Sequence, residues 1–181
     1  MALGRIIGKV TTNHFSFKAD SEVKKFEFIQ VNHKNYGDVL CQIIEIENTK
    51  DDVIAKCLII GFKDEEGKVK QLRIPFEVNS EVNLATDEFI KKIILFKDPS
   101  KGAFIGKLDG KDIEIRIDLS TVLTKHVAIL AKSGAGKSYT VGVLLEEILK
   151  RKVPLLIIDP HGEYAEMRNP NEDEKERLET Y

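Results

Sequence analysis

Short runs of alternating apolar and polar residues dominate the first two thirds of the chain. His14–Lys18 and Ile113–Ile117 alternate with a period of two, so Phe15 and Phe17 fall on one face of a strand. Other strand-like runs are Arg5–Val10, Lys25–Val31, Val39–Ile46, Val53–Phe62, Val69–Ile74 and Phe104–Gly106. The pattern predicts a region built mainly from short β-strands.

The residues between these runs are typical of turns. Asn48–Asp51 separates two long apolar runs and predicts a hairpin, and Asp64–Gly67 predicts a second turn. Thr86 precedes a short stretch with the character of a capped helical turn. Many short strands separated by glycine and aspartate turns favour a small barrel or sandwich.

The pattern changes at His126. Val127–Leu130 is wholly apolar, as expected of a strand buried on both faces of a parallel sheet. The next eight residues, 131–138, fit the phosphate-binding pattern G-x-x-x-x-G-K-[ST], except that Ala131 replaces the first glycine. From Tyr139 to Lys152, apolar residues recur at helical spacing. A strand, a loop and a helix in this order form the context in which such a loop binds nucleotide.

Each residue type in the loop has a chemical use. Gly134 and Gly136 allow the backbone N–H groups to turn toward phosphate oxygens. Lys137 is expected to reach the β- and γ-phosphates of ATP, and Ser138 to ligate Mg²⁺. The residues expected to bind nucleotide are Ser133, Gly134, Ala135, Gly136, Lys137, Ser138 and Tyr139.

A second apolar run, Leu155–Ile158, ends in Asp159. If this run is a strand, Asp159 lies at the carboxyl end of the sheet, on the same edge as the phosphate loop. Asp159 is a candidate catalytic residue that holds a Mg²⁺-bound water or its hydrogen-bond network. The alternative is a structural role as an N-cap or turn acid before Pro160. His161 follows without a partner nearby in sequence, which favours a solvated loop residue over a base.

Composition limits the possible classes of protein. The apolar share of 42% excludes disorder throughout, and no run reaches the length of a membrane span. The N-terminus lacks the apolar run of a signal peptide, so we expect a cytoplasmic protein. A net charge of −2 gives no compositional support for nucleic-acid binding.

Two segments, Lys125–Tyr139 and Ile157–Tyr164, resemble the HerA family of DNA-translocating ATPases, which is grouped with FtsK and the conjugation ATPases. The Asp-Pro-His-Gly-Glu-Tyr segment is the more specific of the two. The resemblance implies an α+β protein. A small β-barrel of the HerA and ATP-synthase type would span residues 1–120, and the start of a RecA-like α/β P-loop domain would span residues 121–181.

The resemblance also implies a function. HerA proteins are hexameric ring helicases that use ATP to move along double-stranded DNA. They act in DNA repair with the NurA nuclease, which docks on the barrel, and near the recombination nuclease machinery that resects broken ends. The family implies a nucleotide contact for Lys125. The candidate catalytic residues, from the loop pattern and the acid after the second run, are Lys137 and Asp159.

The residues after Asp159 are too few for a complete RecA-like sheet, so we expect a fragment of a longer ATPase. Two alternatives stay open. One is a non-hydrolysing module that docks a partner, and the other is a conjugation-type pump for DNA.

Overall fold

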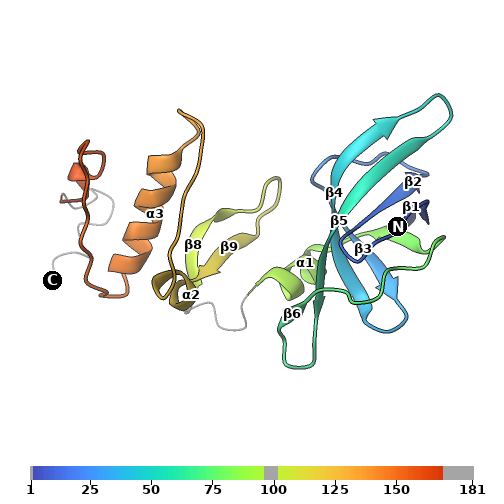
Figure 1. Ribbon diagram of the computed structural model, residues 1–181, viewed down its shortest axis with the longest axis horizontal. Helices are drawn as coiled ribbons and strands as arrows, with labels where there is room; N and C mark the ends of the chain where they lie inside the picture. Colours follow the sequence, from blue (N-terminus) through green and yellow to red (C-terminus); the bar gives the residue numbers. More distant parts are fainter. Residues whose placement is uncertain (1, 96–101, 169–181) are drawn as a thin grey trace. The chain divides into compact units, whose positions relative to one another are not determined.

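The computed structural model of the protein describes residues 2–95 and 102–168. The chain forms two compact units, Met1–Lys97 and Asp98–Tyr181 (Figure 1). The second unit includes a strand hairpin at residues 102–118. From the sequence this hairpin was expected in the first domain, which would end at residue 120. Each unit is described by itself below.

The first unit is a closed antiparallel barrel of six strands, joined in the order β2-β1-β7-β3-β4-β5 and closed by pairing of β2 with β5. Its strands are β1 (Ala2–Ile7), β2 (His14–Ala19), β3 (Phe28–His33), β4 (Gly37–Asn48), β5 (Val53–Lys63) and β7 (Glu81–Leu84). A short seventh strand, β6 (Val69–Lys70), pairs with the end of β5. The barrel and the mixed α+β class predicted from the sequence are confirmed.

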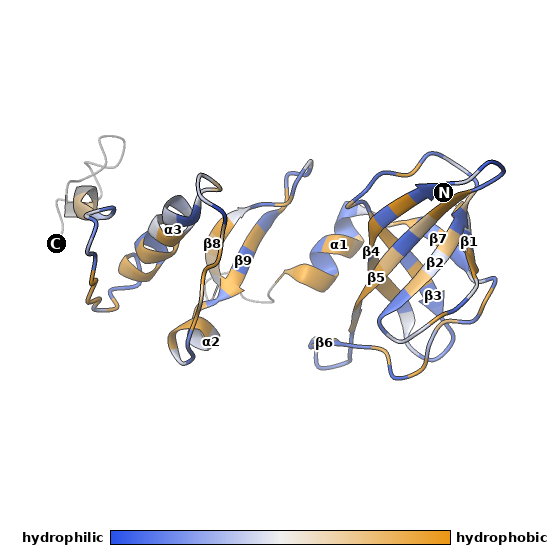
Figure 2. Ribbon diagram, turned by 45° about the horizontal axis from the view of Figure 1, so that its top comes forward, coloured by the Kyte–Doolittle hydropathy of each residue, from blue (hydrophilic) through white to orange (hydrophobic). Residues whose placement is uncertain are grey.

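Alternating residues of the barrel strands point inward and form the core. Along β2 both phenylalanines are buried, as the alternation predicts, and Phe17 lies opposite Ala55 across the closing pair. The alternation is visible along β4 and β5 in Figure 2. The core includes Ile6, Phe15, Phe17, Ile29, Val31, Val39, Cys41, Ile43, Ala55, Cys57, Ile59 and Val82.

One glycine is required where β1 and β2 pair. Gly4 has a φ of 156°, and a Cβ built on it would lie 1.9 Å from the carbonyl oxygen of Lys18. Any side chain at this position would therefore have to displace the backbone of β2. The register of β1 shifts here between its pairing with β7 at Ala2 and at Gly4.

The structure differs from the sequence pattern at the end of the barrel. The run Val69–Ile74 forms a strand only over its first two residues, because only Val69 and Lys70 pair with β5. The strand β7 was not predicted, since only Val82 of its four residues is buried. The predicted cap is confirmed. Thr86 accepts a hydrogen bond from the N–H of Phe89 at the start of α1 (Asp87–Ile94), which contacts β4 and β5.

The second unit contains the hairpin of β8 (Gly102–Lys107) and β9 (Glu114–Asp118), then α2 (Leu119–Leu123) and α3 (Lys137–Leu149). A short 3₁₀ turn follows at Ala165–Arg168. The helix α3 contacts β8, and the buried centre consists of Ala103, Leu119 and Ile148. The helix predicted over Tyr139–Lys152 is confirmed, although it starts at Lys137 and ends at Leu149.

A buried carboxylate fixes α3 to β8. Glu147 accepts a hydrogen bond from the N–H of Phe104 at 3.0 Å and ion-pairs with Lys150 and Arg151 at 3.2 Å. Arg151 also donates to the carbonyl of Gly102 at 2.6 Å. Burial raises the pKa of Glu147, but the Phe104 N–H and the two cations outweigh burial, so its pKa lies below the ordinary value.

The two apolar runs predicted as parallel strands are not strands in the structure. Residues 127–130 and 155–158 have irregular backbone, and Leu130, Leu156 and Ile158 are 91%, 89% and 85% exposed. A parallel strand needs a hydrogen-bonded neighbour, and neither run has one among the residues described here. None of the described helices is long and apolar enough to cross a membrane.

Candidate nucleotide-binding loop

The phosphate-loop pattern, residues 131–138, leads into α3 and ends within its first turn (Figure 1). Gly134 and Gly136 have φ values of 76° and 86°, a left-handed conformation that other residues adopt only with strain. The N–H of Ala135 donates to the carbonyl of Lys132 at 3.1 Å and closes the turn. The backbone conformation of the loop thus explains why glycine occupies both positions.

The N-terminus of α3 is open. Gly136 is the N-cap, and no side chain accepts a hydrogen bond from the first turn. Residues 131–137 are exposed, and Ser138 is half-buried. Unpaired N–H groups and the positive end of the helix dipole both favour an anion at such a position. The start of α3 therefore suits an anion.

Lys137 and Ser138, at the start of α3, share one partner. The Ser138 hydroxyl donates a hydrogen bond to Oε2 of Glu163, and Lys137 Nζ lies 3.8 Å from the same oxygen. The side chains of Lys137 and Glu163 are 47% and 40% exposed. A carboxylate therefore contacts the two side chains expected to meet phosphate and metal.

Asp159 organises the loop that carries Glu163. Its Oδ2 accepts the N–H of Tyr164 at 2.8 Å, and its carbonyl oxygen accepts the N–H of Gly162 at 3.4 Å. The N–H of Tyr164, helped by those of the intervening residues, holds the pKa of Asp159 below its ordinary value, although partial burial opposes this. Asp159 thus accepts the hydrogen bonds of a turn acid, one of the two roles considered from the sequence.

Other predicted site residues lie differently. Tyr139 is 79% exposed on the first turn of α3. Lys125 follows Thr124, the C-cap of α2, and is exposed. Figure 1 shows the chain running from α2 to the N-terminal end of α3 as an extended segment, with the two helices at its opposite ends. The structure does not bring Lys125 to the phosphate loop, and its nucleotide contact stays a prediction.

Sequence reasoning did not identify Glu163 as a site residue. It lies 25 residues after Ser138, in a segment singled out only for its resemblance to a family. No local pattern links the two positions, because the contact arises only when the chain folds back past α3. An acid two positions beyond His161 was the only available signal.

The residues at the loop fit a magnesium–nucleotide complex. Mg²⁺ prefers oxygen ligands and is bound in such sites by one or two protein oxygens together with the substrate phosphates. The Ser138 hydroxyl and the Glu163 carboxylate supply oxygens of this kind side by side. Among the described residues there is no group of three or more His, Cys, Asp or Glu that could hold a metal by itself.

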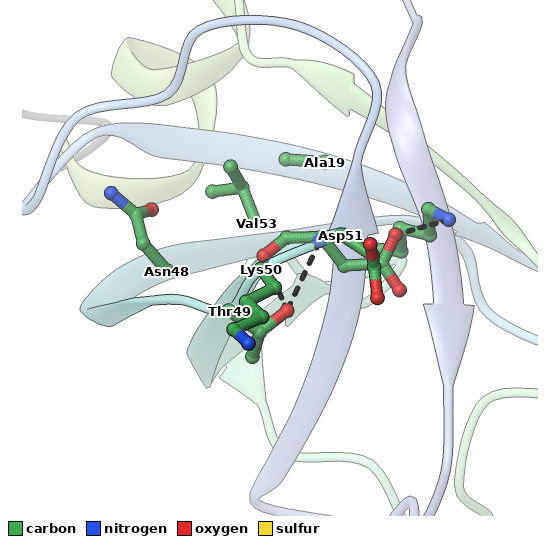
Figure 3. Close-up of a pocket in the computed structure, with 8 residues that line it drawn as sticks. Ala19, Asn48, Thr49, Lys50, Asp51 and Val53 are labelled. Atoms are coloured by element: carbon green, nitrogen blue, oxygen red, sulfur yellow. Dashed lines mark hydrogen bonds and ion pairs between the residues drawn. The ribbon is translucent and has the colours of Figure 1, made fainter.

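A separate pocket of about 370 Å³ lies at the tip of the β4–β5 hairpin, beside the end of β2 (Figure 3). The polar side chains that line it mostly stabilise the hairpin itself. Thr49 donates its hydroxyl to the carbonyl of Asp52 at 2.9 Å, and Asp52 pairs with Lys18. We assign no chemistry to this pocket.

Comparison with known proteins identifies relatives. Residues 103–181 match the family model described as "Helicase HerA, central domain". The chain is 33% identical over 168 residues to the probable DNA double-strand break repair helicase HerA of Methanocaldococcus jannaschii, covering 92% of this chain and 33% of the relative. It is 30% identical over 195 residues to the DNA double-strand break repair helicase HerA of Sulfurisphaera tokodaii, covering 94% of this chain and 38% of that protein.

The HerA helicase of Sulfolobus acidocaldarius is 28% identical over 193 residues, again with 94% of this chain and 38% of the relative covered. The chain therefore spans between a third and two fifths of the length of these relatives. The similarity includes both the barrel and the unit that carries the phosphate loop, since more than nine tenths of the chain takes part. This chain is homologous to the HerA-family helicases over most of its length.

Proposed function

We propose that the loop at residues 131–138 binds ATP as its magnesium complex. The observation that carries this proposal is the uncapped N-terminus of α3, preceded by two left-handed glycines and occupied by Lys137 and Ser138. The N–H groups of residues 133–139 would surround the phosphates, with Lys137 beside the β- and γ-phosphates. Ser138 would contribute its hydroxyl oxygen to Mg²⁺.

We further propose that the nucleotide is hydrolysed in the assembled protein. Lys137 would neutralise the negative charge that develops on the phosphates. Asp159 would act through the loop that it organises, because its carboxylate is engaged by the N–H of Tyr164. A base that orients water and a cation that stabilises the leaving group are also needed. We expect these from further chain or from a neighbouring subunit, where Lys125 would also find its nucleotide.

The biological role follows from the family. The relatives are named as DNA double-strand break repair helicases. We infer that this chain contributes to an ATP-driven translocase on double-stranded DNA, assembled as a hexameric ring. The barrel would dock a NurA-type nuclease and connect the ring to the recombination nuclease machinery. A self-contained core supports the barrel as a docking unit.

The test of nucleotide binding is Lys137→Ala in the intact protein. Calorimetry with ATP and excess magnesium should show at least a tenfold loss of affinity, because a charged contact to phosphate contributes about 1.5–3 kcal/mol. The matched control is Lys92→Ala, which removes the same charge from an exposed position of α1 in the barrel unit. Wild-type affinity in Lys137→Ala would reject the proposed site.

The alternative of a docking module that does not hydrolyse ATP makes a different forecast. It expects co-elution with the nuclease and no release of phosphate by the intact protein. A conjugation-type pump would prefer single-stranded over double-stranded DNA as the stimulating polymer. The relatives are named as helicases of DNA double-strand break repair, which favours the repair translocase over the conjugation-type pump.

A further inference from the structure

Glu163 is an acid placed where a nucleotide phosphate is expected. Its Oε2 accepts the Ser138 hydroxyl and lies 3.8 Å from Lys137 Nζ. These are the same two side chains that the proposed function assigns to metal and phosphate. The Glu163 carboxylate is therefore an anion beside the proposed phosphate position. A bound triphosphate would lie close to it.

The position of Glu163 is built into the fold. The segment folds back on Asp159, whose carboxylate receives the N–H of Tyr164, the residue after Glu163. Gly162, the residue before it, has a φ of 69° and donates its N–H to the carbonyl of Asp159. The backbone on both sides of Glu163 is thus tied to one residue, which directs the Glu163 carboxylate toward the start of α3.

The charge on Glu163 affects the two forms of the nucleotide in opposite ways. A triphosphate without metal carries several negative charges, and a carboxylate within a few ångströms repels it. In the magnesium complex, a divalent cation lies between nucleotide and protein oxygens. The same carboxylate then attracts the cation, either as its ligand or through a bound water. Whether Glu163 contacts the cation directly or through water, Lys137 would then pair with the phosphates and no longer with Glu163.

We propose that Glu163 is a specificity-determining residue, which makes the loop select the magnesium complex of a nucleoside triphosphate and reject the metal-free nucleotide. This inference rests on the proposed function, because it requires that Lys137 and Ser138 meet the nucleotide. It assigns a ligand form, not a catalytic step. Asp159 is the positioning residue, since it holds the backbone on both sides of Glu163.

The experiment measures the dissociation constant of ATP for the intact protein twice, with excess magnesium and with EDTA. The quantity of interest is the ratio of the two constants in wild type and in Glu163→Gln. We expect the preference for the magnesium complex to fall by about tenfold in the variant, because the neutral amide neither repels free ATP nor attracts the cation. In a magnesium titration at fixed ATP, the variant should also need more metal for half saturation.

The matched control is Glu146→Gln, an exposed acid on α3, which should keep the wild-type ratio. Thermal melting of each variant shows that the fold is intact, as expected for a side chain that is 40% exposed. An unchanged ratio in Glu163→Gln, with ATP still bound by the wild type, overturns this inference alone. Equal tightening of both forms also overturns it, because Glu163 would then only occupy the phosphate position. Failure of the wild type to bind magnesium–ATP overturns the proposed function, and this inference with it.

Discussion

The two units of this chain use their apolar residues differently. In the barrel, six strands close on themselves, and side chains such as Phe17 and Val31 are fully buried. In the second unit the buried cluster is small, formed by Ala103, Leu119 and Ile148, and most residues of the two apolar runs lie exposed. Every barrel strand has antiparallel partners within the unit, some in neighbouring hairpins such as β4–β5 and some distant in sequence such as β1 and β7. The two apolar runs have no paired strand among the described residues. The barrel therefore supplies hydrogen-bonded partners for all of its strands, whereas the second unit supplies none for these two runs.

The largest expected effect is in the barrel core. Phe17→Ala should destabilise the barrel by about 3–5 kcal/mol, because it leaves a cavity beside Ala55 at the pairing that closes the barrel. Chemical denaturation followed by far-UV circular dichroism would measure this loss. Phe26→Ala is the matched control, since Phe26 is 56% exposed, and its cost should stay within about 1 kcal/mol. Equal costs for both variants would mean that the barrel is not the self-contained unit described.

An intermediate effect is expected at the contact between α3 and β8. Glu147→Gln should destabilise the second unit by about 1–3 kcal/mol, because it weakens hydrogen bonds to Phe104 and Arg151. The pKa of Glu147 is lowered in the folded state, so the stabilisation is present above its unfolded pKa of about 4.3. It is lost as the pH falls through the lower folded pKa.

Unfolding of the wild type at a series of pH values below 5 would show this loss as a decline in stability that is shallower in Glu147→Gln, where only the other carboxyls contribute. Parallel pH profiles in the two proteins would contradict the assignment. The measurement also sharpens the comparison between the units, because the barrel core in our description contains no buried acid.

The smallest effect is expected in the exposed runs. Leu156→Ser should change the stability of this chain by less than about 0.5 kcal/mol, since Leu156 is 89% exposed. Ile148→Ser is the contrasting variant, because Ile148 is buried on α3 and should lose several times more. A cost above 1 kcal/mol for Leu156→Ser would show that the run is covered in solution. We expect such a cost once further strands of a longer protein or a subunit pack on this run.

Local patterns explain which parts of the fold could be predicted. The strands β2, β4 and β5 and the helix α3 have their periodicity in consecutive residues, and Thr86 caps α1 through a contact three residues away. The strand β7 has a single buried residue, and its identity depends on pairing with β1 and β3. The runs 127–130 and 155–158 have the composition of strands but lack partners among the described residues. Their composition indicates a propensity for strands, but without a hydrogen-bonded neighbouring strand they do not form one.

The candidate site shows the same division. Gly134, Gly136, Lys137 and Ser138 lie together in sequence, and their geometry follows from the turn into α3. The sequence pattern predicted Asp159 close to the phosphate loop. It left open whether Asp159 holds a Mg²⁺-bound water and its hydrogen-bond network or has a structural role in a turn. Its hydrogen bond to Tyr164 favours the second role. Glu163 is placed by a reversal of the chain that no short pattern encodes.

The pairing of β1 with β7 has a consequence for synthesis on the ribosome. Arg5 lies opposite Glu81, so the first strand waits for a partner that emerges almost eighty residues later. Until then the nascent chain holds an open sheet whose first strand has one free edge. The hairpins β1–β2 and β4–β5 can form early, but the barrel closes only after residue 84 leaves the exit tunnel. Protection of this nascent edge by a chaperone, or slow translation beyond residue 84, would then influence the yield of folded protein.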